Sequence, residues 1–266
     1  MNTINNPGSF YPYQFKSKRQ IASSIFRRLK TGKLLEAFNF FATEGLNRLN
    51  KKNIFNKSGK YYCPLCKNNS GAFIHMSNSY RFSFNSVCPY CSSRARHRAL
   101  YILYKKEILS LNQNSKILHF APEPVFYSIF KNKYFSYETT DYFLEDVDLP
   151  KEDVQNLTIS DEHYDLVLSN HVIEHVPDDE KALAEMARIT KKGGKVIITV
   201  PGNYKRSKTL YFKNLENNGH YRDYGMDFMD KMKKAFAEVL VIDLYTFDTK
   251  GELAIPEKEL AFIGIK

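Results

Sequence analysis

The chain has 266 residues, of which 43% are hydrophobic, so it can bury one full core and still hold an additional segment. It contains neither the roughly 18 consecutive apolar residues that span a bilayer nor the charged-then-apolar start of a signal peptide, so we expect a cytoplasmic protein. The net charge of +10 is uneven: residues 1–115 carry 19 Lys and Arg against 3 acidic residues, whereas residues 116–266 carry a net charge of −6.

Apolar residues recur at helical spacing between Ser17 and Asn50, which predicts two or three amphipathic helices. Six basic residues surround the apolar faces of these helices: Lys18, Arg19, Arg27, Arg28, Lys30 and Lys33. Such a segment attracts the phosphates of nucleic acids, nucleotide-linked substrates or anionic lipids. Three interpretations stay open: a solvated basic surface, packing on the neighbouring domain, or peripheral association with an anionic surface such as the inner membrane face.

The four cysteines form two C-P-x-C pairs, Cys63 with Cys66 and Cys88 with Cys91, separated by 21 residues. Close pairs of this kind in a reducing compartment favour a metal over a disulfide. Each C-x-x-C turn offers two thiolates, and two such turns complete the tetrahedral shell of Zn²⁺. We therefore expect a structural zinc ion here. Arg94, Arg96, His97 and Arg98 follow at a helix start, where they would meet an anion or tie the cysteine segment to the next domain by ion pairs.

From Lys116 onward, apolar strand-like runs alternate with helical stretches. We expect strands at residues 117–120, 135–140, 164–169, 195–200, 239–245 and 260–265. This alternation predicts an α/β domain with a largely parallel sheet covered by helices on both faces. The expected domains are a basic helical region at 1–59, a four-cysteine zinc segment at 60–95 and an α/β domain at 96–266, which begins with a helix over 96–111.

The stretch 153–201 holds motifs in a distinctive order: Asp153-Val154, Asp165 at the start of a strand, V-I-E-H at 172–175, and Lys-Gly-Gly at 192–194. In this order they resemble class I methyltransferases of the type 11-like group, over about 150 residues. The resemblance implies a Rossmann-like, mostly parallel sheet of about seven strands and S-adenosylmethionine as the methyl donor. It also implies a set of donor-binding residues at the carboxyl ends of the strands: Phe120, Ala121, Pro122, Glu123, Asp141, Asp153, Val154, Ser169, Asn170 and His171.

The loop after the first strand departs from the usual family pattern. In the family this loop carries an acidic residue and several glycines. Residues 117–124 read ILHFAPEP and contain neither that acidic residue nor a glycine. The resemblance implies that Glu123 replaces the missing carboxylate and pairs with the amino group of the methyl donor. The A-P-E loop and the H-x-R-x-Y-G segment at 220–225 resemble zinc-knuckle methyltransferases of bacterial surface-polysaccharide loci. That resemblance implies a sugar or sugar-nucleotide acceptor and substrate-binding roles for His220, Arg222 and Tyr224.

Histidines supply the candidate catalytic groups, because imidazole titrates near neutral pH and can take the proton of an acceptor hydroxyl. His171, His175 and His220 are the candidates, with His171 or His220 favoured as the base. Two other functions stay open. One is an RNA methyltransferase that holds nucleic acid with its zinc segment and basic half, and the other is a non-catalytic binding module with an altered donor loop.

Overall fold

A computed structural model describes residues 12–77, 82–108, 111–112, 114–131, 136–216, 219–256 and 259–266. Contacts divide the chain into two units, one of residues 109–243 with 260–266 and one of residues 9–108 with 244–259. This division differs from the boundary expected at residue 95. Arg98 explains the difference, because its fully buried guanidinium donates to the carbonyls of Ser93 (3.2 Å) and Leu253 (2.6 Å) and so binds the helix and the returning segment to the cysteine region.

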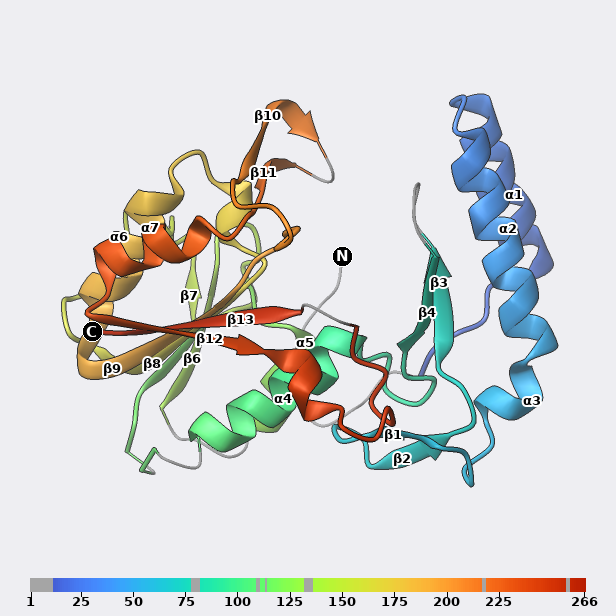
Figure 1. Cartoon of the computed structure of the whole chain (residues 1–266), viewed down its shortest axis with the longest axis horizontal. Coiled ribbons are helices and arrows are strands. Elements are labelled where there is room, and N and C mark those ends of the chain that lie inside the picture. The colour runs from blue at the N-terminus through green and yellow to red at the C-terminus, as the bar shows by residue number, and fades with distance from the viewer. Residues whose placement is uncertain are drawn as a thin grey trace. The chain divides into compact units, whose positions relative to one another are not determined.

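The sheet unit, residues 109–243 with 260–266, contains a sheet of seven strands (Figure 1). Their spatial order is β12 (Glu238–Asp243), β13 (Leu260–Ile265), β9 (Thr190–Thr199), β8 (Tyr164–Asn170), β5 (Ile117–Phe120), β6 (Tyr137–Asp141) and β7 (Leu149–Pro150). The strands from β9 to β7 pair in parallel, whereas β13 runs antiparallel between β9 and β12. The predicted mostly parallel, Rossmann-like sheet of seven strands is therefore confirmed.

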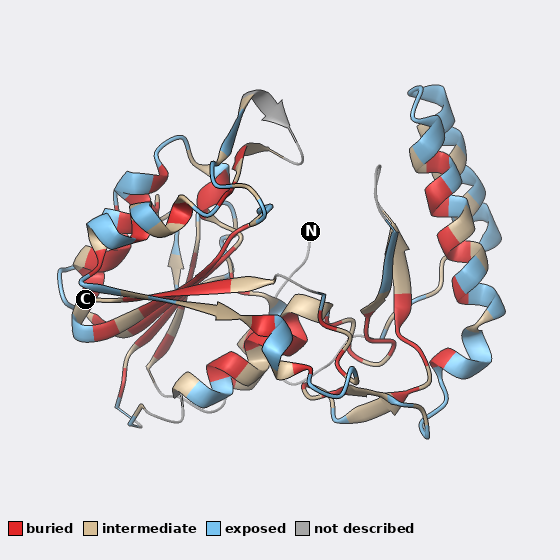
Figure 2. Cartoon of the chain, in the orientation of Figure 1, coloured by how far each residue is buried: buried red, intermediate tan, exposed pale blue. Residues whose placement is uncertain are grey.

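The central strands read as continuous apolar runs because both faces of the sheet are covered. All four residues of β5 and six of the seven in β8 are buried (Figure 2). One core cluster joins these strands to the helices α6 (Asp179–Ile189) and α7 (Phe228–Ala235) through residues such as Val167, Met186 and Phe228. The packed centre fixes the strand ends, from which the loops of the site project.

Loops of defined geometry follow the central strands. After β5 comes the helix α5 (Pro124–Phe130), and after β8 comes the short 3-10 helix η1 (Ile173–His175). A hairpin of β10 (Leu210–Glu216) and β11 (His220–Asp223) forms between β9 and α7 and contacts η1. The sequence analysis placed a substrate-binding segment here but did not anticipate the hairpin.

The zinc-segment unit, residues 9–108 with 244–259, is built from helices and small hairpins. Its elements are α1 (Lys18–Lys30), α2 (Leu34–Leu49), α3 (Lys51–Ile54), β1 (Tyr61–Cys63), β2 (Asn68–Ser70), β3 (Ile74–Ser77), β4 (Phe82–Val87), α4 (Ala95–Ile108) and η2 (Leu244–Phe247). The expected helix over 96–111 is α4, and residues 109–110 of that expectation lie outside the described residues. Among the described residues, none of the helices has the length and apolarity to cross a membrane.

Candidate functional site

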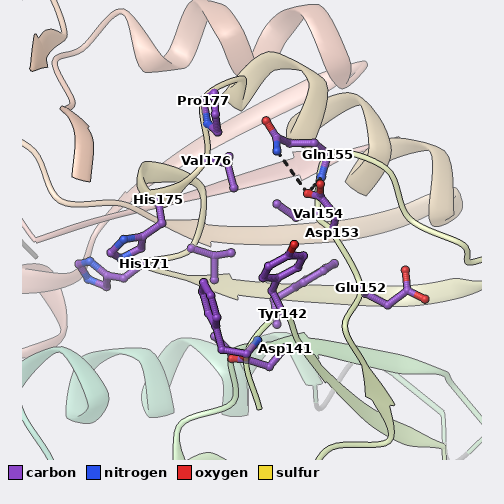
Figure 3. A pocket seen from close by; sticks show the side chains of 14 residues that line it. Asp141, Tyr142, Glu152, Asp153, Val154, Gln155, His171, His175, Val176 and Pro177 are labelled. Atoms are coloured by element: carbon purple, nitrogen blue, oxygen red, sulfur yellow. Dashed lines mark hydrogen bonds between the residues drawn. The ribbon is translucent and has the colours of Figure 1, made fainter. Parts of the chain in front are cut away.

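A cavity of about 550 Å³ opens at the carboxyl ends of β5, β6 and β8. Three loops and one turn line it: Phe120, Ala121, Asp141, Tyr142, Phe143, Glu152, Asp153, Val154, Gln155, His171, Val172, His175, Val176 and Pro177. His171 and His175 lie together on one side, whereas Asp153 and Gln155 lie on the other (Figure 3). This cavity, called here the donor pocket, occupies the position at which doubly wound sheets bind their ligands.

The structure brings six of the ten predicted donor-binding residues to the lining of the donor pocket: Phe120, Ala121, Asp141, Asp153, Val154 and His171. Pro122, Glu123, Ser169 and Asn170 are not part of that lining. Glu123 is engaged by its neighbours, because Asn170 Nδ2 donates to Glu123 Oε2 (3.2 Å) and His119 Nε2 lies 3.2 Å from the same oxygen. Glu123 thus fixes the loop after β5 against the end of β8.

Two residues that line the pocket hold a left-handed backbone although neither is glycine. Ala121 has a φ of +47° directly after β5, and His171 has a φ of +54° directly after β8. Their amides donate to the neighbouring strands, Ala121 to Thr140 O (2.8 Å) and His171 to Thr199 O (2.9 Å). Ala121 therefore adopts the left-handed conformation that glycine adopts most readily.

The two predicted donor-binding carboxylates of the pocket, Asp141 and Asp153, also form turns. Asp141 Oδ1 accepts from the amides of Phe143 (2.6 Å) and Leu144 (2.8 Å), and Asp153 Oδ1 accepts from the amide of Gln155 (2.9 Å). These bonds orient each carboxylate while the side chain still lines the cavity. Each Asp can therefore form a turn and still present its carboxylate to a ligand.

Sequence reasoning missed an aromatic pair at the pocket. Tyr142 and Phe143 follow β6, stack edge to face with ring centroids 5.1 Å apart, and are 58% and 85% exposed. Large exposed aromatic side chains at a cavity provide a flat apolar surface for a ring system. The sequence did contain a signal for this pair, because two aromatic residues directly follow Asp141 at the end of a predicted strand.

Three histidines gather around the buried carboxylate of Glu174. His171 Nδ1 lies 3.3 Å and His175 Nε2 lies 3.9 Å from Glu174 Oε1. The ring of His220, on β11, meets the ring of His175 edge to face at a centroid distance of 4.7 Å. Burial lowers the pKa of His220 below its usual value. The structure thus brings together all three histidines that the sequence singled out as candidate catalytic groups.

None of the three predicted substrate-binding residues, His220, Arg222 and Tyr224, lines the cavity. Arg222 is 1% exposed, pairs with Asp179 (2.9 Å) and donates to the carbonyl of Val176 (2.7 Å). Tyr224 is fully buried, and its hydroxyl donates to Asp179 Oδ2 (3.0 Å). Both side chains therefore hold the loop between η1 and α6, which itself lines the donor pocket.

The four cysteines meet in the zinc-segment unit. The Sγ atoms of Cys63 and Cys91 lie 3.6 Å apart, those of Cys66 and Cys88 lie 3.7 Å apart, and all four lie within 4.8 Å of one another. Sulfur atoms around a tetrahedral Zn²⁺ ion are separated by about 3.8 Å, given a Zn–S bond of about 2.3 Å. The cluster therefore has the donor set and the dimensions that zinc requires.

Comparisons with known proteins agree with this fold. Residues 108–198 match the family model described as "Methyltransferase domain". A 51-residue stretch is 37% identical to phosphatidylethanolamine N-methyltransferase of Cereibacter sphaeroides, covering 19% of this chain and 25% of that protein. The chain thus spans about a quarter of the length of the curated relative that it matches.

Solved structures with similarity to the chain include methyltransferases. A SAM-dependent methyltransferase of Thermotoga maritima is 23% identical, with a TM-score of 0.45 over 64% of this chain and 89% of that one. Phosphoethanolamine N-methyltransferase 2 of Haemonchus contortus is 15% identical, with a TM-score of 0.46 over 69% and 55%. The family match spans β5 to β9 and the loops of the donor pocket between them, so this part of the chain is similar to a methyltransferase domain.

Proposed function

We propose that the protein transfers the methyl group of S-adenosylmethionine to a hydroxyl group of a small acceptor. The observation that carries this proposal is the donor pocket, which lies at the strand ends of the matched domain with Asp141 and Asp153 in its lining. A carboxylate in this position accepts hydrogen bonds from a ribose diol, and the exposed rings of Tyr142 and Phe143 offer an apolar face to a nucleoside.

The donor, when bound, supplies an electrophilic methyl carbon on a sulfonium. Transfer forms an O–C bond at the acceptor and breaks the C–S bond, so the chain must align the acceptor and receive the hydroxyl proton. His171 and His220 are the candidates for that proton, since both belong to the histidine group beside the pocket. Arg222 donates to the carbonyl of Val176 and so holds the loop that follows His175 beside the cavity.

The proposed acceptor class is a sugar or sugar nucleotide of surface-glycan synthesis. Its support is the A-P-E loop together with the H-x-R-x-Y-G segment, which resemble methyltransferases of polysaccharide loci. The partial match to a phosphatidylethanolamine N-methyltransferase makes an amine headgroup the second class to screen. Turnover of sugar nucleotides but not of ethanolamine compounds would support the first class, and the reverse would replace it.

The test of donor binding is calorimetry with S-adenosylhomocysteine. Asp141→Asn keeps Oδ1 as the acceptor for the turn but removes the negative charge, so we expect affinity to fall at least about tenfold, as for a lost charged hydrogen bond. Asp146→Asn, exposed and outside the pocket lining, should bind as the wild type does. A wild-type protein that takes up neither the donor nor its product at millimolar concentration would disprove the proposal and favour the non-catalytic module.

An RNA methyltransferase is the second candidate because residues 1–115 carry 19 Lys and Arg against 3 acidic residues. Binding through phosphates weakens steeply with salt, since counterions released on binding must be recaptured. RNA affinity that falls by orders of magnitude between about 50 and 200 mM salt, together with methylation of that RNA, would favour this function.

A further inference from the structure

Glu174 and the histidines around it have the composition of a metal site. Binding of the methyl donor does not require such a site. Three of the seven histidines of the chain lie around this one carboxylate. They come from separate elements: His171 follows β8, His175 ends η1 and His220 begins β11. The contact between β11 and η1 brings His220 beside His175.

Glu174 carries the inference because its carboxylate is buried without a hydrogen-bond donor. Its exposed fraction is 0%, and neither Oε1 nor Oε2 accepts a hydrogen bond from any described residue. A buried carboxylate without donors is strongly destabilising unless a positive charge offsets it. His175 Nε2 lies 3.9 Å from Glu174 Oε1, beyond hydrogen-bond distance, as expected of two ligands placed around a shared ion. His171 Nδ1 lies 3.3 Å from the same oxygen but forms no hydrogen bond with it.

We propose that Glu174, His175 and His220 bind one divalent first-row transition-metal ion at the edge of the donor pocket. One donor atom from each residue lies within 4.8 Å of the others. Three donor atoms about 2.1 Å from one ion lie about 3.0–3.6 Å from one another, so shifts of about 1–2 Å in these side chains close the shell. Two imidazoles and one carboxylate suit Mn²⁺, Fe²⁺ or Zn²⁺ and leave coordination positions for substrate oxygens.

A catalytic role for this metal site rests on the proposed methyl transfer. An ion beside the pocket binds the acceptor hydroxyl, lowers the pKa of that hydroxyl and favours acceptors that present two adjacent oxygens. The O–H bond breaks, the O–C bond forms and the C–S bond of the donor breaks. His171 receives the proton, because its Nδ1 faces Glu174 while its buried Nε2 has no hydrogen-bond partner among the described residues.

The test measures metal binding without turnover. The purified chain, with its cysteine site loaded with Zn²⁺, is titrated with Mn²⁺, and free Mn²⁺ is followed by electron paramagnetic resonance. Mn²⁺ is the probe because thiolates bind it poorly. We expect one Mn²⁺ per wild-type chain, with affinity at least about 100-fold weaker in Glu174→Gln and His220→Ala. His163→Ala is the matched control, since His163 contacts Lys116 and lies outside the group.

Two outcomes would overturn the metal site: no saturable Mn²⁺ binding by the wild type, or unchanged affinity in His220→Ala. The second variant decides the matter if Glu174→Gln fails to fold, because His220 is only half-buried. Calorimetry with S-adenosylhomocysteine in the absence of Mn²⁺ separates the two proposals. A protein that binds this nucleoside but not Mn²⁺ refutes the metal site alone, whereas one that binds Mn²⁺ but no nucleoside refutes the donor pocket.

Discussion

Ala121 and His171 share a left-handed backbone at the ends of neighbouring strands, and both line the donor pocket. A side chain in this conformation costs about 1–2 kcal/mol relative to the right-handed form. Residues of this kind persist where the surrounding structure fixes them, and they cluster at ligand sites. The two turns therefore position the floor and the histidine side of the pocket before any ligand arrives.

Ala121→Gly should relieve this cost at the loop after β5. Glycine also loses about 0.5–1 kcal/mol more conformational entropy on folding, so we expect the free energy of unfolding to rise by up to about 1 kcal/mol. Urea denaturation measures the change. Ala182→Gly in α6 is the control and should lower stability, since a helix interior disfavours glycine. A drop of more than about 1 kcal/mol for Ala121→Gly would show that the turn is not left-handed.

At the residue scale, the sequence predicted which residues lie at the pocket better than it predicted which side chains contact one another. Asp141, Asp153 and His171 could be placed at the pocket because strand ends in a parallel sheet converge. Arg222 was expected to meet the acceptor, but its pairing with Asp179 depends on how the β10–β11 hairpin packs against η1. Long-range packing of that kind leaves no periodic signal in a sequence, so the inward direction of this side chain could not be predicted.

At the scale of elements, the parallel sheet and its helices were predictable because their apolar runs and periods are local properties. The segment 244–259 was not, since its place beside α4 depends on the buried Arg98 and on carbonyls more than 150 positions away in the chain. Arg98 donates to these carbonyls rather than forming the expected ion pairs, and burial lowers its pKa to about 10.

Removal of zinc should unfold the small hairpins while the donor pocket keeps its function. The first cysteine turn joins two strands of three residues each, β1 and β2, so a bound metal would supply much of its stability. We expect one Zn²⁺ per chain by mass spectrometry of the metal content, and a lower melting temperature after chelation. Cys88→Ser should lose the ion, whereas Ser83→Ala in β4 should keep it.

Binding of S-adenosylhomocysteine should survive chelation, because the cysteines belong to the other unit. Zinc-free protein with full thermal stability and four reactive thiols would contradict the structural role of the metal.

At the scale of the whole molecule, the helices α1 and α2 present an unusual surface, because α2 buries polar residues and exposes large apolar ones. In α2 the buried positions include Asn39, Thr43 and Glu44, while Phe38 and Leu49 are 64% and 88% exposed. The chain therefore presents apolar side chains where a helix of a globular protein normally presents polar ones. Exposed apolar surface of this extent marks a surface that contacts a partner.

The charge beside this face indicates the partner. α1 has no acidic residue in its first turn and carries Arg27, Arg28 and Lys30 in its last. Basic residues beside exposed apolar ones are typical of helices that lie at the surface of anionic membranes, where each adds about 1 kcal/mol of attraction. We therefore propose peripheral membrane association through α1–α2.

Vesicle cosedimentation tests this association. We expect binding to vesicles with about 30% phosphatidylglycerol, little binding to pure phosphatidylcholine, and weakening with salt, because the attraction depends on surface charge. Replacing both exposed residues, Phe38→Glu with Leu49→Glu, should reduce binding at least about tenfold. Phe84→Glu, a change at a 63% exposed position on β4, should bind as the wild type does. If the double variant instead converts a dimer to a monomer without changing vesicle binding, the apolar face joins two copies of the chain and the membrane proposal fails.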